Sequence, residues 1–362
     1  MKKICFLFES LKTSNGVAKA ALAMANLLAE SGQYQVDLIP MFKCEPLNRF
    51  CISPNVKVQT VFGFYFKGFA KLLDLLPNRL LYHMVIRKKY DIEVGFQYGL
   101  YTKIISASTN KKAKHIAWMH GYDYGLRLRK YYPGFDKVLC VSRYNADRLK
   151  KELEQAGLYA NVDYCYNVID DGIVREKGSD LVSEQIVERP LLVTVGRFSP
   201  EKGFPRLVTA LHRLYKEGYH FTMWFVGDGL ELAKCKSMFE KEQAFLSSCV
   251  FWGAQINPHK YTSKADLFVC SSFSEGYSNA CTEAIMLGVP VFSTSVPGAN
   301  EIVSDSKAGM VVNNDDESLY QGLKQILDNP SLLTIWKKSL KENQYLFSKE
   351  YRSSRVFSLF ES

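Results

Sequence analysis

The sequence lacks a long hydrophobic run. None of its 362 residues lies in a stretch of about 18 apolar residues, the length that a membrane-spanning helix needs. The opening MKKICFLFES has an apolar run only from Ile4 to Phe8 before Glu9 interrupts it, whereas a secretory signal needs about 7–15 apolar residues. We therefore expect neither a membrane span nor a secretory signal, and we interpret the opening as a buried strand.

Paired or clustered cysteines are also missing. The nine cysteines include no CxxC pair, and no group of histidines and cysteines has the spacing of a metal site. Their odd number and irregular spacing argue against a secreted disulfide scaffold and favour buried, reduced thiols in a cytoplasmic protein. They are Cys5, Cys44, Cys51, Cys140, Cys165, Cys235, Cys249, Cys270 and Cys281.

Common phosphate-binding sequences are absent as well. There is no GxxxxGK[ST] loop and no GxGxxG after the first predicted strand, and VGDG (226–229) is too short to be a dinucleotide fingerprint. No Asp-x-Asp triplet occurs either. A phosphorylated ligand would therefore have to be neutralised by Arg197, Lys202 and backbone N–H groups.

The length and charge that are present narrow the choice further. A single core seldom exceeds about 250–300 residues, so a chain of this length predicts two domains. The net charge is +9, and it is uneven: residues 1–169 hold 25 Lys+Arg and 13 Asp+Glu, against 21 and 24 in residues 170–362. The basic first half suits an anionic partner such as a membrane surface, a phosphorylated substrate or nucleic acid, unless it is only a lysine-rich surface.

Short apolar runs alternate with helical patterns along the whole chain, which predicts parallel sheets covered by helices and so an α/β fold. The predicted strands, some with the turn residues that follow them, lie at 2–9, 34–40, 91–97, 115–120, 137–142, 190–199, 220–229, 265–272 and 289–295. The predicted helices, the first with the turn that precedes it, lie at 14–32, 143–157, 204–218, 281–288, 332–344 and 350–360. We expect two Rossmann-like domains, 1–168 and 169–344. The polar stretch 167–180 is interpreted as a linker, and a helix at about 345–362 is expected to pack back on the first domain.

Ligands of open α/β sheets bind outside the carboxyl ends of the strands, so residues just after strands are site candidates. Gly16 lies in the first such turn, where a glycine lets backbone approach a ligand and the helix start favours an anion; any such turn also favours glycine. Arg197 and Lys202 follow another strand and could clamp a diphosphate, or could lie on a solvated turn. His120 follows a strand of the first domain and is either functional or structural.

The stretch SSFSEGYSNACTEAIMLGVP (271–290) is the most informative. Glu275 lies in a loop after a strand, and Glu283 lies about one turn into the next helix. A carboxylate accepts hydrogen bonds from two adjacent hydroxyls, so one glutamate could hold a ribose and the other a hexose. Ser278 or Asn279 could cap the helix, and backbone N–H groups of the loop could face a diphosphate. The candidate donor-binding loop is Glu275, Gly276, Tyr277, Ser278 and Asn279.

These motifs together resemble the retaining glycosyltransferases of the GT-B fold that carry a Glu-x7-Glu signature (glycosyltransferase family 4, or group 1). The signature here is EGYSNACTE, and VGRFSPEKGF, FVGDG and YNVID stand in the expected order. The resemblance is strong over 190–312 and covers the first domain only through Gly16 and HGYD. Val168 departs from the usual Asn-Gly-Val-Asp hinge. The resemblance implies two facing Rossmann-like domains with a cleft between them.

The resemblance also implies roles. The donor is a nucleotide sugar, with a UDP-sugar as the default, and no metal or other cofactor takes part. By position, Arg197 and Lys202 bind the diphosphate, while Glu275 contacts the donor sugar and Glu283 binds the ribose hydroxyls. Gly16 approaches the phosphates and His120 lies near the transferred sugar. The implied catalytic residues are Glu275, His120, Arg197 and Lys202. The acceptor hydroxyl attacks from the face that the diphosphate leaves, so the anomeric configuration is retained.

The acceptor side is less defined. Residues 61–90 mix aromatics, leucines and basic residues. This composition suits contact with anionic lipid at the inner face of the cytoplasmic membrane. The alternative is helices packed on the first domain with exposed lysines. Membrane contact would imply a lipid-linked saccharide acceptor, as in bacterial capsule, O-antigen or lipooligosaccharide synthesis.

Three rival functions remain open. A non-catalytic nucleotide-sugar or glycan-binding protein of the same fold is disfavoured by the complete set of charged residues. Nucleic-acid binding is weaker still and predicts a strongly salt-dependent affinity. A nucleotide-sugar epimerase would share the fold and need no acceptor.

Overall fold

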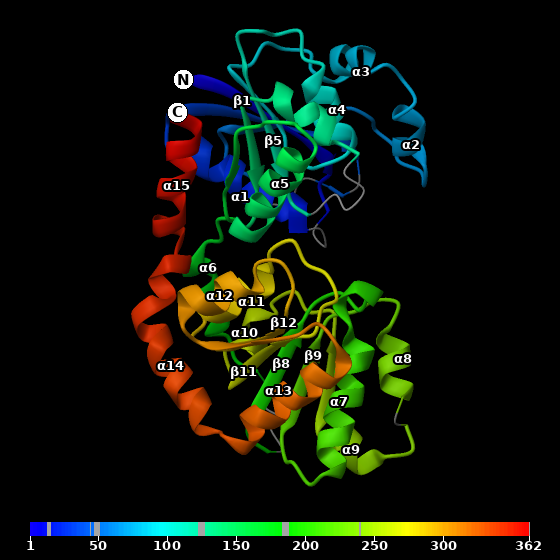
Figure 1. The fold of residues 1–362 in the computed structure, drawn as a ribbon, viewed down its shortest axis with the longest axis vertical. Helices are drawn as coiled ribbons and strands as arrows, with labels where there is room; N and C mark the ends of the chain where they lie inside the picture. Colours follow the sequence, from blue (N-terminus) through cyan, green and yellow to red (C-terminus); the bar gives the residue numbers. More distant parts are fainter. Residues whose placement is uncertain are drawn as a thin grey trace. The chain divides into compact units, whose positions relative to one another are not determined.

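The structure, a computed structural model, describes residues 1–12, 16–43, 45–46, 51–121, 127–182, 188–238 and 240–361. The chain divides into two compact units (Figure 1): unit 1 is Met1–Val168 with Ser353–Ser362, and unit 2 is Ile169–Arg352. Each has a parallel sheet between helices, so the predicted α/β class is confirmed. Within the described part of the chain, no helix combines the length and the apolarity needed to cross a membrane.

Unit 1 holds a seven-stranded parallel sheet in the order β3-β2-β1-β4-β5-β6-β7. Its strands are buried apolar runs, as expected when helices cover both faces of a sheet. The strands are β1 Lys2–Ser10, β2 Tyr34–Phe42, β3 Val56–Val58, β4 Ile92–Gly95, β5 Lys114–Met119, β6 Lys137–Cys140 and β7 Val162–Tyr164. The helices are α1 Gly16–Glu30, α2 Phe69–Leu73, α3 Asn78–Val85, α4 Leu100–Ser106, α5 Arg143–Gln155 and α15 Lys349–Glu361.

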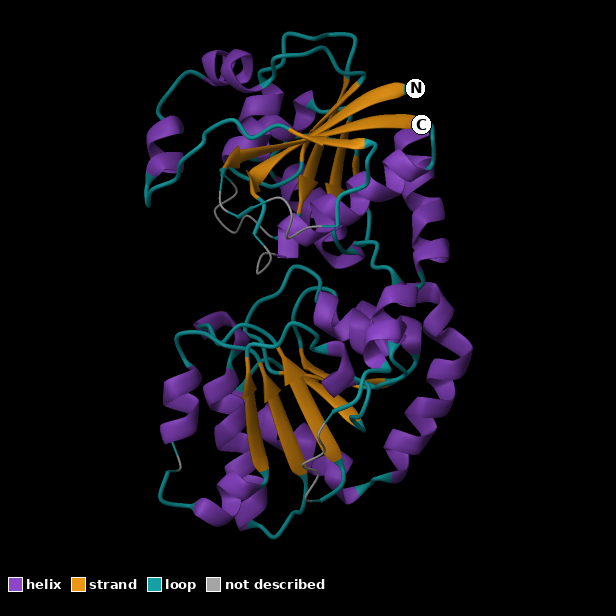
Figure 2. Cartoon of the chain, turned by 180° about the vertical axis from the view of Figure 1, so that it is seen from behind, coloured by secondary structure: helices purple, strands orange, loops and turns teal. Residues whose placement is uncertain are grey.

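Unit 2 holds a six-stranded parallel sheet in the order β10-β9-β8-β11-β12-β13. The strands are β8 Leu191–Val195, β9 Thr222–Val226, β10 Cys249–Gly253, β11 Leu267–Cys270, β12 Val291–Thr294 and β13 Gly309–Val312. The helices are α6 Asp171–Gly178, α7 Phe204–Lys216, α8 Leu232–Ser237, α9 Gln243–Ser247, α10 His259–Thr262, α11 Asn279–Met286, α12 Ala299–Ser306, α13 Asp316–Asp328 and α14 Ser331–Asn343. Figure 2 shows the helices on both sides of this sheet.

The strand order reverses once in each sheet, between β1 and β4 and between β8 and β11. In open α/β sheets the crevice at the carboxyl ends of these two strands is where ligands bind, because the connecting loops run to opposite faces there. The two reversal points therefore indicate where a site should lie within each unit.

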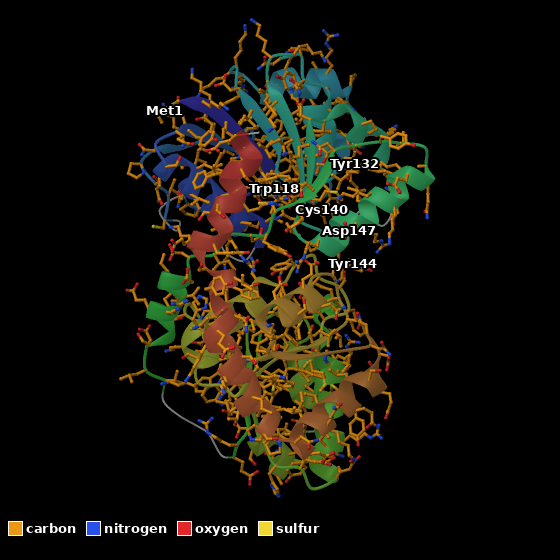
Figure 3. The ribbon with its side chains drawn as sticks, turned by 60° about the vertical axis from the view of Figure 1, so that its left-hand side comes forward. Met1, Trp118, Tyr132, Cys140, Tyr144 and Asp147 are labelled. Carbon is orange, nitrogen blue, oxygen red and sulfur yellow. The ribbon has the colours of Figure 1, made fainter. Side chains whose placement is uncertain are left out.

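Helix α15 completes the core of unit 1 from the far end of the chain. The Phe360 ring lies 6.3 Å from that of Phe6 and 6.2 Å from that of Trp118, measured between ring centroids. Figure 3 labels Trp118 between the sheet and this helix. Unit 2 extends to Arg352 rather than to 344, and the helix begins at Lys349 rather than near 345.

The boundary between the two units falls within residues 167–180, where the linker was expected, but most of these residues form α6 of unit 2. Asp170 caps this helix by accepting a hydrogen bond from Ile173 N at 3.1 Å. Gly178 packs so closely on α11 that a Cβ there would lie 2.5 Å from a methyl carbon of Leu287. The polar composition reflects only the exposed face of a short, capped helix.

The described cysteines are free thiols. Seven are buried, as the sequence predicts, but Cys51 is exposed. Cys44 lies outside the described residues.

Candidate functional site

The turns that follow β8 and β11 meet at the reversal point of the unit 2 sheet. Lys202 ends a short 3-10 helix at Pro200–Lys202, and Glu275 lies in the loop between β11 and α11. Lys202 Nζ donates to Glu275 Oε1 at 2.5 Å, and Ser272 Oγ donates to the same oxygen at 2.8 Å. Two of the predicted site residues are thus in direct contact.

The protonation state of Lys202 follows from this pairing. Burial by itself lowers the pKa of the Lys202 ammonium, but attraction to Glu275 and the hydrogen bond to it outweigh burial, so the pKa is raised. Lys202 therefore carries its charge at neutral pH and holds it where an anion can meet it.

Arg206 of α7 holds the loop that carries Glu275, and the sequence did not single it out. Its buried guanidinium donates to Ser271 O at 2.6 Å and to Ser272 O at 2.8 Å, both from Nη2. The Phe273 ring lies 3.7 Å from its central carbon. Backbone carbonyls and one aromatic ring fix this arginine, and that arrangement has no short sequence signature.

Gly203 explains how Lys202 comes so close to that loop. It has φ +64°, and a Cβ there would collide with the carbonyl oxygen of Ser271. Only glycine accepts both the left-handed backbone and this contact.

In the loop between Glu275 and α11, a ligand would meet mainly backbone groups, because the side chains are engaged elsewhere. Ser278 Oγ accepts from Cys281 N at 3.3 Å, which confirms the predicted cap. The Tyr277 side chain is buried and turned inward, and its hydroxyl accepts from Arg352 Nη2 at 2.8 Å. Tyr277 can therefore meet a ligand only through its backbone. Gly276 and Asn279, which flank this turn, are half-buried.

Glu283 lies one turn into α11 and is half-buried. Its Oε2 is 3.6 Å from His259 Nδ1, the first residue of α10. His259 was not predicted, because a four-residue helix after a proline carries no periodicity that would mark it. The contact places a hydrogen-bonding ring beside the carboxylate that the sequence assigns to ribose.

Arg197 is exposed, two residues beyond the end of β8. It acts on its neighbour Glu201: burial raises the pKa of that carboxyl, but a hydrogen bond from Ser199 and the charges of Lys202 and Arg197 lower it overall. The turn after β8 therefore holds two cations, Arg197 and Lys202, beside the Glu201 carboxylate.

Gly16 and His120 belong to unit 1, at the carboxyl ends of β1 and β5. No atom of the described residues lies within 4 Å of the position that a Cβ on Gly16 would take. The His120 ring packs on Phe96, with centroids 4.3 Å apart. Its Nε2 is buried and has no hydrogen-bond partner among the described residues, and burial lowers the His120 pKa to about 3. Tyr122 and Asp123 of the HGYD motif lie outside the described residues.

Across the described ranges, no three His, Cys, Asp or Glu side chains are grouped closely enough to hold a metal ion.

The site can be compared with known proteins. Residues 179–343 match the family described as Glycosyl transferases group 1. The chain is 26% identical to N-acetylgalactosamine-N,N'-diacetylbacillosaminyl-diphospho-undecaprenol 4-alpha-N-acetylgalactosaminyltransferase of Campylobacter jejuni, over 60% of this chain and 58% of that protein. It is 27% identical to lipopolysaccharide core biosynthesis glycosyltransferase LpsE of Rhizobium meliloti, over 75% of each.

Among solved structures, Anabaena Alr3699/HepE in complex with UDP matches 99% of both chains with a TM-score of 0.75 at 17% identity. Two Rossmann-like units with parallel sheets and this likeness define a protein of the GT-B fold. The Lys202–Glu275 pair lies within residues 179–343, the part of the chain that matches the glycosyl transferases group 1 family.

Proposed function

We propose that this protein is a retaining, metal-independent glycosyltransferase. It moves a hexose or N-acetylhexosamine from a nucleoside diphosphate sugar, with uridine as the expected base, to a saccharide or lipid-linked saccharide. The observation that carries the proposal is the contact between Lys202 and Glu275 at the reversal point of a nucleotide-binding type of sheet. HepE, which shares the fold, was solved with UDP, and the named relatives act in lipopolysaccharide or lipid-linked saccharide synthesis. A cytoplasmic location stays a prediction.

The charges suggest how the leaving group is stabilised. As the bond between the anomeric carbon and the diphosphate breaks, negative charge grows on the leaving oxygen. Lys202 and Arg197, together with N–H groups at the start of α11, would stabilise that charge from fixed positions. The departing phosphate would take the proton of the acceptor hydroxyl, and attack on the same face would retain the configuration.

Each remaining residue has one task in this proposal. Glu275 accepts hydrogen bonds from donor-sugar hydroxyls, and Glu283 accepts them from the ribose. From unit 1 we assign the open backbone at Gly16 to the phosphates. We assign the neutral His120 ring to the surroundings of the transferred sugar.

The test is to incubate the protein with a panel of nucleotide sugars and to measure nucleoside diphosphate release with and without acceptors. Glu275→Ala should abolish transfer and leave nucleotide binding largely intact, while Glu317→Ala, at an exposed carboxylate of α13, should behave as the wild type. The anomeric configuration of the product, read by NMR, tests retention.

A normal rate for Glu275→Ala would remove this residue from the mechanism. Tight nucleotide-sugar binding without turnover on any acceptor would instead favour the non-catalytic binding protein.

A further inference from the structure

Large apolar side chains are exposed together on one part of unit 1. They are Phe64, Tyr65, Phe66, Leu72, Leu75, Leu76, Leu80 and Met84, which lie in and around α2 and α3. Leu75 is 80% exposed. Figures 1 and 2 show α2 at the margin of unit 1, beyond the sheet. Exposed apolar residues scattered singly are ordinary, but a contiguous group is typical of an interaction site.

The two helices are apolar on their inner and on their outer sides. Phe69 and Leu73 of α2 are buried against unit 1, as are Leu81 and Val85 of α3. A helix that only packed on its domain would turn polar residues outward. Here α3 instead exposes Leu80 and Met84, which are four residues apart and so share one face.

Positive charge surrounds this apolar surface. The basic residues of the segment, all exposed, are Lys67, Lys71, Arg79, Arg87, Lys88 and Lys89. Lys88 Nζ lies 2.9 Å from Asp37 Oδ2 of β2, so the charge of Lys88 is balanced within unit 1. The only carboxylate between residues 61 and 90 is Asp74, and its Oδ1 lies 2.6 Å from Lys103 Nζ of α4. The segment therefore presents exposed leucines and aromatics among side chains whose net charge is positive.

We infer that residues 64–89 form a docking surface for an anionic lipid bilayer. The leucines and aromatics enter the boundary between headgroups and acyl chains, and the lysines and arginines meet the lipid phosphates. A second copy of this chain is a poorer partner, because two such surfaces would bring their cations together.

The docking surface continues into a cavity of unit 1. Phe42, the last residue of β2, contacts Tyr65 and Phe69, with ring centroids 5.2 Å and 5.4 Å apart. Phe42 also lines a cavity of about 540 Å³ together with Leu11 and Pro40. This cavity lies at the carboxyl ends of β1 and β2, the same edge of the sheet that carries Gly16.

This geometry also narrows the acceptor, an inference that rests on the proposed function. A saccharide joined to a membrane lipid through phosphate would reach the cavity from the bilayer along Phe42 and Tyr65. Lys43 lines the cavity, and Lys12 Nζ lies 5.3 Å from the centre of the Tyr65 ring, so cations are available for the linking phosphate. Glu45 also lines the cavity and would favour the sugar hydroxyls over the phosphate.

The experiment is sedimentation of the full chain with vesicles of phosphatidylcholine alone and with vesicles in which about one quarter of the lipid is phosphatidylglycerol. We expect binding to the anionic vesicles only, weaker at high salt. Leu75→Glu with Leu80→Glu should reduce binding at least about tenfold, since the apolar contact is lost and two added carboxylates repel the lipid phosphates.

The matched control is Leu181→Glu with Leu230→Glu, two exposed leucines of unit 2 that should not affect binding. Thermal unfolding confirms that both double variants fold. The inference is overturned if the wild type stays unbound to anionic vesicles, or if the control pair loses binding as strongly as the Leu75 and Leu80 pair. It is also overturned if Leu75→Glu with Leu80→Glu instead converts a dimer of this chain into a monomer.

Nucleoside diphosphate release with a water-soluble acceptor separates this inference from the proposed function. The Leu75 and Leu80 pair should keep that rate and lose only transfer to a lipid-linked acceptor in vesicles. Vesicle binding without any nucleotide-sugar turnover would leave the docking surface standing and reject the glycosyltransferase. Equal rates on the lipid-linked acceptor for wild type and variant would reject the acceptor route.

Discussion

Lys202 Nζ and Glu275 Oε1 lie 2.5 Å apart, although 73 residues separate them along the chain. The contact joins the turns after β8 and β11, the two strands between which the sheet order reverses. A diphosphate bound there would compete with Glu275 for Lys202. In the proposed mechanism, the diphosphate would replace Glu275 as the partner of Lys202, and donor-sugar hydroxyls would replace Lys202 as the partner of Glu275.

Replacing Lys202 by Met should lower kcat about 10²- to 10³-fold, because a preorganised charge that stabilises the leaving diphosphate is lost. Steady-state nucleoside diphosphate release measures the effect. Lys324→Met, at a surface lysine of α13 paired with Glu217, is the control and should keep the normal rate. A Lys202→Met enzyme as fast as the wild type would show that this charge has no part in the reaction.

Glu283 should govern recognition of the ribose. The wild type should use a donor whose ribose lacks the 2′-hydroxyl roughly ten- to a hundredfold less well, since a hydrogen bond to a charged group contributes about 1.5–3 kcal/mol. Glu283→Ala should lose most of this preference, because the partner of the hydroxyl is gone. The kcat/KM values of the wild type and of Glu283→Ala, each with the ribose donor and with the 2′-deoxy donor, form a double-mutant cycle. If the effects of the mutation and of the missing hydroxyl simply add, Glu283 does not contact that hydroxyl.

Chelation should leave transfer unchanged. In the proposed site Lys202 and Arg197 neutralise the diphosphate, so treatment with EDTA should not alter the rate of nucleoside diphosphate release. Activity that vanishes with EDTA and returns with a divalent cation would show that the two side chains are insufficient.

His120 should make the protein less stable in acid. Its pKa in the folded protein is about 3, below the ordinary value of about 6.5. Between these values the unfolded chain binds a proton that the folded chain does not, so stability falls as the pH falls, by at most about 1.4 kcal/mol per pH unit.

Urea unfolding at pH 7.5 and 5.0 measures this. The loss of unfolding free energy on acidification should be smaller in His120→Gln than in the wild type, by up to about 2 kcal/mol. His220→Gln, at an exposed histidine, serves as the control. Equal losses in His120→Gln and the wild type would mean that His120 takes up its proton as freely in the folded protein as in the unfolded one.

Strong local signals made part of this architecture predictable. β8 follows from its run of apolar residues. The end of α7 follows from Gly218, which adopts a left-handed backbone conformation, and the start of α11 follows from the Ser278 cap. β3 and β13 were missed, although the equally short β6 and β11 were predicted. β3 and β13 lie at the edges of their sheets and are only partly buried, so they lack the continuous apolar run of a central strand.

The candidate site divides in the same way. Glu275 and Lys202 could be named from their places after strands, since parallel strands end at one edge of the sheet. Arg206 and His259 could not, because each acts through a contact with a residue distant in sequence. The sequence placed Tyr277 in the loop but could not show which way its side chain points. The side chain points inward because its hydroxyl accepts a hydrogen bond from Arg352.

The last helix has a consequence for biosynthesis. Residues 353–361, which supply Phe360 to the aromatic core around Phe6 and Trp118, leave the ribosome only after all of unit 2 has been made. Unit 1 thus spends most of translation with a gap in its interior. A nascent chain halted before Ser353 should expose those rings to chaperones, although all of unit 2 has by then been synthesised.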